Sequence, residues 1–399
     1  MPESARPTAS EKNRRMRSIR VAFINLHAGA HGEYGALLAA AVAEGGKDFE
    51  VMSVVSNALA VSERARLPLA KARLETVNTG RGLRRLMTFW RTLRLLCAYR
   101  PDIIHDPAGS GVGEILPLRL LMPWIAPLIV TEHNPVVHPG MTGWHHGIAR
   151  ALTRHTAARI HVHGPKARAE MSALGVADDR LVTIRHGAFD EYGDAAGQFS
   201  RAAADRPRIL VFGALRPNKG IDMLPEIFRR VRARFPGAIL EIRGKRPKAL
   251  DRAQGAALDA ALAELAEMPG VELDNAHVDE AAIPRLFGEC TICLLPYRSA
   301  TQSGVAMIAM STDTPIVATR VGDIPDIIED GHTGLLADPT PEAITTRIIE
   351  ALEEPDATAA RAREAARFAR EECAWPVIGT QMRAVYRDIA SAGKAHAQR

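Results

Sequence analysis

Cysteine is scarce in this sequence, and its scarcity argues against a fold held together by disulfides. Only four cysteines occur among 399 residues, so we expect a reducing compartment. Cys290 and Cys293 form a CxxC pair at the start of an apolar run, but no second pair accompanies them. A zinc site needs more ligands than this, so we expect two core cysteines rather than zinc or redox chemistry.

Long apolar segments are also missing. No run of about eighteen apolar residues occurs, which argues against a membrane-spanning helix. Residues 1–17 are polar and basic without an apolar core, so we expect a disordered tail rather than a signal peptide or an anchor. These features predict a cytoplasmic protein that is soluble or peripheral to a membrane.

Acidic residues are few in the first quarter of the chain. Residues 1–100 hold 17 Lys and Arg against 8 Asp and Glu, whereas the net charge of the whole chain is only +5. Such an excess suits anionic partners such as lipid headgroups or phosphates. We do not expect a nucleic-acid partner, because no groove pattern of interleaved aromatic residues accompanies the charge.

Apolar runs rich in Val, Ile and Leu alternate with helical patterns from residue 20 onward. Runs of this kind predict parallel sheets that are covered on both faces. Two series of them predict an α/β protein with two doubly wound, Rossmann-like domains. The expected strands are Val21–Leu26, Val51–Ser56, Ile103–His105, Leu128–His133, Ile160–His163, Leu181–His186, Ile209–Gly213, Ile239–Arg243, Val271–Leu273, Ile292–Leu295, Ile316–Thr319 and Gly334–Ala337.

A polar, small-residue stretch at 190–206 separates the two series and is expected to be a linker. It divides a first domain at 18–189 from a second at 207–374. The final segment, 375–399, has helical spacing and is expected to cross back toward the first domain.

The most informative stretch is Leu294–Leu336, in which a strand, a polar loop, a helix and a second strand follow one another. Ser303 and Gly304 open the helix. The N–H groups and the positive dipole end of a helix N-terminus favour an anion. This pattern predicts a nucleotide-phosphate site.

Two cations follow the first strand of the second domain. Arg216 and Lys219 lie in the loop after Gly213, where they could clamp a diphosphate. The alternative is two solvated loop charges, and no Walker A motif is present.

Two further candidates lie in the first domain. The loop at residues 27–35 contains Gly29, His31 and Gly32; it is either an acceptor-side binding loop or a plain strand–helix connection. It lacks the dinucleotide-binding fingerprint, which argues against NAD. His133 ends a buried strand, at the sheet edge where ligands bind. His138, His145 and His146 fit no ligand spacing, so we expect no metal.

A basic helix is predicted at 80–100. Its apolar stripe contains Leu83, Leu86, Met87, Trp90, Leu93 and Cys97, with Arg81, Arg84, Arg85, Arg91 and Arg94 largely off it. One interpretation is contact with an anionic membrane surface through residues 81–100. The other is a crossover helix that buries the stripe on its own sheet.

Three motifs together resemble glycosyltransferase family 4, whose GT-B fold places two Rossmann-like domains across a cleft. They are FGALRPNKGIDML at 212–224, IRHGAFD at 184–190 and PIVATRVGDIPDIIEDGHTGLL at 315–336. The resemblance, which spans Arg20 to about Ile389, implies retaining transfer of a hexose-type sugar from a nucleoside diphosphate sugar, with no metal or other cofactor. By analogy, and because the first domain is basic and a reducing compartment is expected, we expect a glycan or lipid-linked acceptor. The expected pathway is exopolysaccharide or envelope polysaccharide synthesis at the inner face of the cytoplasmic membrane.

The resemblance assigns roles to several residues. Lys219 matches the diphosphate-binding lysine, and Arg216 substitutes for an arginine that the family has at Ala214. His133 matches the histidine that faces the donor sugar, and Gly29 matches the acceptor-side loop.

One departure from the family pattern concerns two glutamates, which align with Ala300 and Ile308. A subset with SxxQSGV fits Ser299 and the donor-binding candidates Gln302, Ser303, Gly304 and Val305. The missing glutamates leave one alternative open, a catalytically silent GT-B partner or binding subunit. A second alternative is a sugar-nucleotide epimerase on the same architecture.

Overall fold

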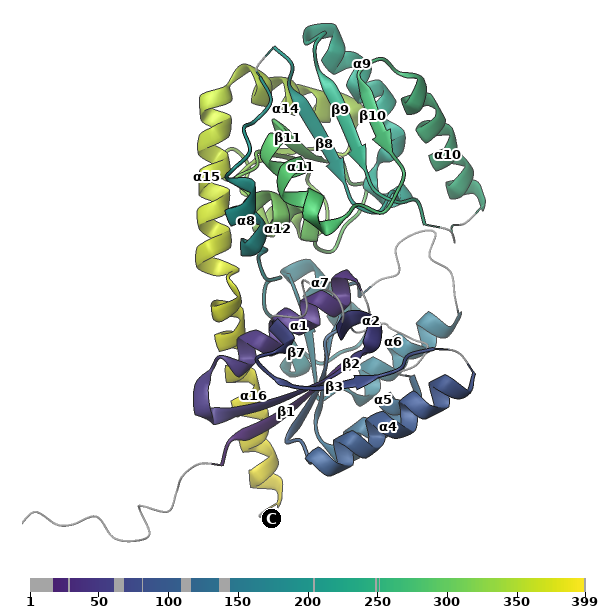
Figure 1. The fold of residues 1–399 in the computed structure, drawn as a ribbon, viewed down its shortest axis with the longest axis vertical. Coiled ribbons are helices and arrows are strands. Elements are labelled where there is room, and N and C mark those ends of the chain that lie inside the picture. Colours follow the sequence, from purple (N-terminus) through teal and green to yellow (C-terminus); the bar gives the residue numbers. More distant parts are fainter. Residues whose placement is uncertain are drawn as a thin grey trace, which may run out of the picture. The chain divides into compact units, whose positions relative to one another are not determined.

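The computed structural model describes residues 17–27, 29–60, 68–80, 82–108, 116–135, 144–203, 205–247, 250 and 252–397. Within these residues the strands form two sheets, each flanked by helices (Figure 1). The α/β fold with two doubly wound, Rossmann-like sheets expected from the sequence is confirmed. The basic tail, Arg81 and His138 lie outside the described residues, as do the side chains of His145 and His146.

The first sheet has seven strands in the order β3-β2-β1-β4-β5-β6-β7. The chain runs outward from β1 to β3, returns to β4 and continues to β7, which is the doubly wound pattern. The strands are β1 (Ile19–Asn25), β2 (Phe49–Ser56), β3 (Arg73–Val77), β4 (Ile103–Asp106), β5 (Leu128–Thr131), β6 (Arg159–Val162) and β7 (Leu181–Thr183). The helices are α1 (Ala30–Ala43), α2 (Asn57–Ala60), α4 (Leu83–Tyr99), α5 (Leu116–Ile125), α6 (Trp144–Thr156), α7 (Pro165–Ala173) and α8 (Asp190–Ala196).

The second sheet has six strands in the order β10-β9-β8-β11-β12-β13. Its strands are β8 (Arg208–Phe212), β9 (Ile239–Arg243), β10 (Val271–Asp274), β11 (Ile292–Leu295), β12 (Ile316–Thr319) and β13 (Leu335–Ala337). Its helices are α9 (Leu224–Arg234), α10 (Arg252–Glu267), α11 (Ile283–Glu289), α12 (Gly304–Ser311), α13 (Ile324–Ile327), α14 (Pro341–Glu353) and α15 (Pro355–Glu372), and α16 (Trp375–Ala397) ends the chain.

The chain forms two compact units whose boundaries cut across the first sheet. One unit comprises the residues up to Val130, residues 156–158 and those from Gly379 onward; the other comprises 131–155 and 159–378. In the first unit, Arg383 of α16 donates to the Ala41 carbonyl, 2.6 Å away. The stretch 190–206, predicted to be a linker, begins with α8.

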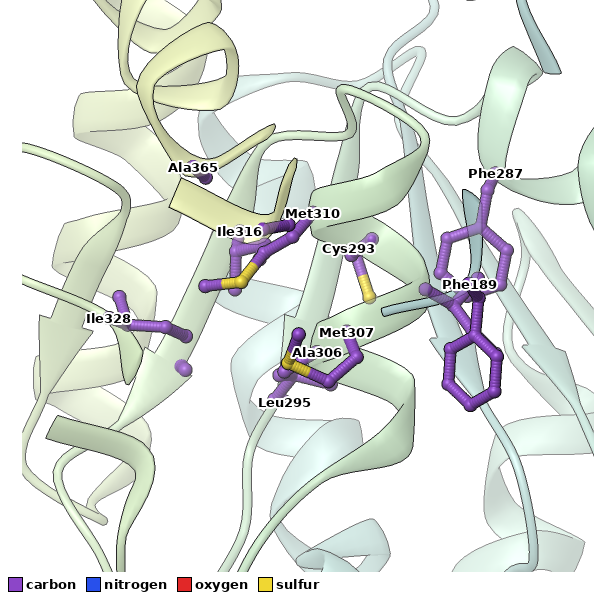
Figure 2. Close-up of a cluster of buried hydrophobic side chains, with 14 of the residues drawn as sticks. Phe189, Phe287, Cys293, Leu295, Ala306, Met307, Met310, Ile316, Ile328 and Ala365 are labelled. Carbon is purple, nitrogen blue, oxygen red and sulfur yellow. The ribbon is translucent and has the colours of Figure 1, made fainter. Parts of the chain in front are cut away.

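The second sheet carries an apolar core in which α12 is embedded. Met307 and Met310 of α12 pack with Cys293, Leu295 and other side chains of the neighbouring strands (Figure 2). Burial raises the pKa of the Cys290 thiol to about 12, and it also raises the pKa of the Cys293 thiol well above its usual value. Both thiols are fully buried, so the expectation that they are core residues is confirmed.

The face of helix α4 that is buried is not the apolar stripe that the crossover interpretation requires. Its buried side chains are Thr88, Thr92, Leu96 and Tyr99, whereas the predicted apolar stripe at Leu83, Leu86, Met87 and Trp90 is exposed. The expectation that the helix buries this stripe on its own sheet is therefore wrong. The side that meets the sheet relies on threonines, a tyrosine and one leucine instead.

Candidate functional site

A tight loop after β8 holds the first two candidate cations. Arg216 begins the 3₁₀ turn η3 (Pro217–Lys219), and Gly220 follows with φ of 68°. A Cβ at Gly220 would lie 1.9 Å from the Pro296 carbonyl oxygen, so only glycine allows the two loops to approach this closely. At the start of the loop, Gly213 donates its N–H to the Arg243 carbonyl, 2.9 Å away.

Lys219 lies against an aromatic ring. Its ammonium nitrogen is 3.5 Å from the centre of the Tyr297 ring, close enough for a cation–π interaction. Burial of the ammonium group, reinforced by the positive charge of Arg216, lowers the pKa of Lys219 to about 7. Burial also lowers the pKa of Arg216. Two desolvated cations side by side favour an anionic ligand that neutralises both.

The same tyrosine reaches the N-terminus of α12. The Tyr297 hydroxyl lies 3.0 Å from Ser303 Oγ, which in turn accepts from the Ala306 N–H at 3.1 Å. Ser303 is thus the capping residue of α12. Gly304 and Val305 form its first turn, where N–H groups have no acceptor within the helix. The cation loop and the helix N-terminus are therefore joined through one side chain.

The two loops are also joined by hydrogen bonds along their backbones. The Asn218 carbonyl accepts from the Arg298 N–H at 2.9 Å, and the Asn218 side chain donates to the Ser299 carbonyl at 3.0 Å. Gln302 lies beside them, and its Oε1 is buried with no hydrogen-bond partner among the described residues. A buried amide oxygen without a partner is costly unless a ligand or water donates to it.

His133 joins this site through Thr301. The Thr301 hydroxyl lies 3.0 Å from the His133 carbonyl and 2.7 Å from Asn134 Oδ1. His133, Thr301 and the loops around Lys219 all belong to the same compact unit. The predicted donor-side residues are therefore brought together at the carboxyl ends of their strands, where ligands of such sheets bind.

His133 is held by a second histidine that the sequence analysis did not single out. Its Nδ1 lies 3.0 Å from His163 Nε2, and His163 Nδ1 lies 3.3 Å from the Ile184 carbonyl. A carbonyl only accepts, so His163 carries its proton on Nδ1 and accepts at Nε2 from His133. Burial keeps the pKa of His163 well below its usual value. In the neutral form of His133 this arrangement puts the proton on Nδ1 and the lone pair on Nε2. The signal for His163 was present: it follows β6 as His133 follows β5.

Three other residues of the site also escaped the sequence reasoning. Tyr297 and Thr301 act through contacts that no spacing rule predicts. Asp323 accepts from the N–H groups of Lys166, at 2.7 Å, and Ala167, at 3.2 Å, and so caps α7. Its place in the VGDIP segment was the only available signal.

Ala300 and Ile308, which align with the glutamates of the resembled family, are both buried in the apolar core of the second sheet. Neither can offer a hydrogen bond from its side chain. Polar groups around the site come instead from Ser303, Gln302 and the loop backbones.

The acceptor-side candidates lie in the other unit. Gly29 precedes α1 with φ of 71°, His31 is exposed, and Gly32 accepts at its carbonyl from the Asn25 side chain at 2.7 Å. Within the described ranges, no group of three His, Cys, Asp or Glu side chains is arranged to hold a metal ion.

Two family models match the chain, one in each half. The family described as Glycosyltransferase Family 4 matches residues 34–191, and that described as Glycosyl transferases group 1 matches residues 206–354. Over 304 residues the chain is 29% identical to the GDP-mannose-dependent alpha-(1-6)-phosphatidylinositol monomannoside mannosyltransferase of Mycolicibacterium smegmatis, with 70% of this chain and 76% of that protein covered.

Two solved structures share the fold. Sucrose-phosphate synthase from Thermosynechococcus elongatus has a TM-score of 0.72 at 20% identity, covering 94% of this chain and all 100% of that one. Anabaena HepE in complex with UDP-glucose has a TM-score of 0.69 at 15% identity, covering 93% and 100%.

Proposed function

Because the chain belongs to the family 4-like glycosyltransferases and is a sugar-nucleotide-dependent enzyme, we propose that it transfers a hexose-type sugar to a glycan or lipid-linked acceptor. The proposed binding of the donor rests on one observation: Lys219 and Arg216 lie in a loop that Tyr297 joins to the capped N-terminus of α12. Two cations and a set of N–H groups suit the charge of a diphosphate.

The roles follow from the chemistry of the leaving group. Charge builds on the departing diphosphate as the bond from the anomeric carbon to the phosphate oxygen breaks. Lys219, Arg216 and the N–H groups of Gly304 and Val305 are fixed cations and dipoles that can stabilise it without a metal or other cofactor. Gln302 Oε1 and His133 Nε2 are acceptors for sugar hydroxyl groups, and Gly213 lets the backbone approach the donor.

For stereochemistry we propose retention by attack on the same face. The acceptor oxygen bonds to the anomeric carbon as the diphosphate leaves, and the hydroxyl proton passes to the departing phosphate oxygen. Ala300 and Ile308 provide no carboxylate for a double displacement.

The proposal for the acceptor rests on a loop of the first unit and on what a relative acts on. Gly29, His31 and Gly32 would contact the acceptor. A relative that acts on a phosphatidylinositol monomannoside supports a lipid-linked or envelope polysaccharide acceptor. We accordingly place the protein in the cytoplasm, peripheral at the inner face of the cytoplasmic membrane. No helix in the described residues combines the length and apolar character required to cross a bilayer.

The test is incubation with radiolabelled UDP-, GDP- and ADP-sugars, chosen first by the thermal shift that each produces. Transfer, or slow hydrolysis of one donor, supports the proposal; a changed sugar nucleotide indicates an epimerase, and binding without turnover indicates a silent subunit. Lys219→Ala should abolish donor binding, whereas Lys71→Ala on the surface should leave it unchanged. Full activity of Lys219→Ala would refute the diphosphate assignment.

A further inference from the structure

Large apolar side chains are exposed on two neighbouring helices of the first unit. Of the nine such side chains exposed in the described part of the chain, seven lie on α4 and α5. Trp124 is 89% exposed, Leu83 72% and Met87 62%. Single exposed apolar residues are ordinary, but a contiguous patch marks an interaction surface. The seven are Leu83, Leu86, Met87, Trp90, Leu120, Leu121 and Trp124, and we call them the α4/α5 face.

Both helices lie on the same side of the sheet, and their exposed apolar side chains point away from it. On α4 they recur at helical spacing, opposite Thr88, Thr92 and Leu96, which are buried. On α5 they recur in the same way, opposite the buried Leu118 and Met122. Helix α4 connects β3 to β4 and helix α5 connects β4 to β5, and both connections run in the same direction across the sheet. Right-handed connections place both on one side, and the two helices touch (Figure 1).

The charged side chains that α4 itself carries are all of one sign. Between Glu75 and Asp102 the sequence holds six arginines and no acidic residue. On α5, Arg119 is fully buried in an ion pair with Asp106 and adds nothing to the surface. The exposed arginines of α4 are Arg84, Arg85, Arg91 and Arg94. A second copy of this face would set arginine against arginine, whereas an anionic lipid surface complements it.

A hollow lies on the flank of α4. It has a volume of about 410 Å³ and is lined by Arg84 and Arg91 together with Asn78, Thr79, Met87 and Thr88. Thr88 Oγ1 donates to the Asn78 carbonyl at 2.5 Å, which fixes one wall. Two guanidinium groups beside hydroxyl and amide groups form a set of donors suited to a phosphate, and the apolar face next to it suits acyl chains.

We propose that the α4/α5 face docks on an anionic bilayer, with Trp90 and Trp124 in the interface and a lipid phosphate between Arg84 and Arg91. This inference deepens the peripheral location proposed above and rests on it, but it does not depend on sugar transfer. Tryptophan and arginine are residues that interfacial helices place at the level of the headgroups.

Vesicle sedimentation of the full chain, without nucleotide, tests the charge requirement. We expect binding to phosphatidylcholine vesicles containing one part in about three of phosphatidylglycerol, and little binding to pure phosphatidylcholine. Each arginine at an anionic surface contributes about fivefold to the partition, so Arg84→Gln with Arg91→Gln should lower it roughly 25-fold. The matched control is Arg363→Gln with Arg370→Gln, two exposed arginines on α15, which should change it less than about twofold.

The apolar contact is tested separately. Trp124→Glu should lower the partition at least about tenfold, whereas Leu174→Glu, at another exposed leucine, should not. Brominated acyl chains should quench the tryptophan emission of the wild type, and Trp90→Phe with Trp124→Phe should remove most of that quenching while binding persists. Circular dichroism confirms that each variant is folded.

Several results would overturn the docking surface. Failure of the wild type to bind anionic vesicles would do so, as would equal binding by the variants of the α4/α5 face and the control variants. A dimer that Trp124→Glu converts to a monomer in sedimentation velocity would also overturn it. Thermal shift by nucleotide sugars on the same preparation keeps the two proposals apart. A chain that binds vesicles but shows neither donor binding nor transfer would refute the enzyme proposal alone.

Discussion

The ammonium nitrogen of Lys219 lies 3.5 Å from the centre of the Tyr297 ring, and the hydroxyl of that ring lies 3.0 Å from Ser303 Oγ. One tyrosine thus supports both the cation and the helix cap that we assign to the diphosphate. The aromatic ring partly offsets the loss of water around the ammonium group. The site is prepared for an anion at a cost to the ligand-free protein, because desolvation lowers the pKa of Lys219 to about 7.

Binding of a nucleotide sugar at pH 8 should therefore take up a proton. In the free protein Lys219 is mostly neutral above pH 7, and the diphosphate raises its pKa by favouring the ammonium form. Titration calorimetry in Tris and in HEPES, which differ in ionisation enthalpy, should give different apparent enthalpies. The diphosphate of a nucleotide sugar does not titrate near this pH, so it contributes no proton itself.

Lys219→Arg is the control for this uptake, because arginine stays charged and should bind with equal enthalpies in the two buffers. Affinity of the wild type should also fall as the pH rises from 7 toward 9. Equal enthalpies for the wild type would show that Lys219 is already protonated before the ligand arrives.

Lys219→Met should stabilise the ligand-free protein at pH 7. The folded pKa of about 7 lies below the usual 10.5, so the unfolded chain binds more protons between these values and stability rises with pH across that window. The cost is fully present below pH 7. Methionine removes it, and the free energy of unfolding in urea should increase by roughly 1–3 kcal/mol. Lys71→Met, at an exposed lysine, should change it by less than about 0.5 kcal/mol.

Tyr297 can be dissected with two substitutions. Tyr297→Phe keeps the ring beneath Lys219 but loses the hydrogen bond to Ser303, which should weaken donor binding by about 0.5–1.5 kcal/mol. Tyr297→Leu loses both, and a further loss of about 0.5–2 kcal/mol should follow. Fluorescence or calorimetric titration gives the two affinities. Equal affinities for the Phe and Leu variants would mean that the ring contributes nothing to the position of Lys219.

Most of the fold could be predicted because buried parallel strands consist of Val, Ile and Leu. All twelve expected strands are present, whereas β3 was missed. Its sequence, Arg73–Val77, contains only two apolar residues among five, and it lies at the sheet edge. An edge strand does not need two apolar faces, so it lacks the composition that identified the others.

The orientation of α4 could not be read from its spacing. Periodicity shows that Leu83, Leu86 and Trp90 share one face, but not which side meets the sheet. In the structure that side uses Thr88, Thr92 and Tyr99. The site shows the same division: motifs identified Lys219 and Ser303 one at a time, while the contacts that join them depend on chain segments far apart in the sequence.

His163 should act on catalysis through His133 alone. Its Nδ1 donates to the Ile184 carbonyl, so its Nε2 accepts from His133 Nδ1, 3.0 Å away. In neutral His133 the lone pair then lies on Nε2, the atom that we propose accepts from a sugar hydroxyl. His163→Leu removes this control of the tautomer, and kcat should fall about tenfold or more with little change in nucleotide affinity. His163→Gln can place an amide oxygen near the lost Nε2 and should recover part of the rate. Steady-state kinetics across pH 6–8 with the best donor compares the variants with His155→Leu, at an exposed histidine of α6. A structural role alone would predict equal losses for Leu and Gln, with thermal unfolding temperatures that fall in parallel with the rate.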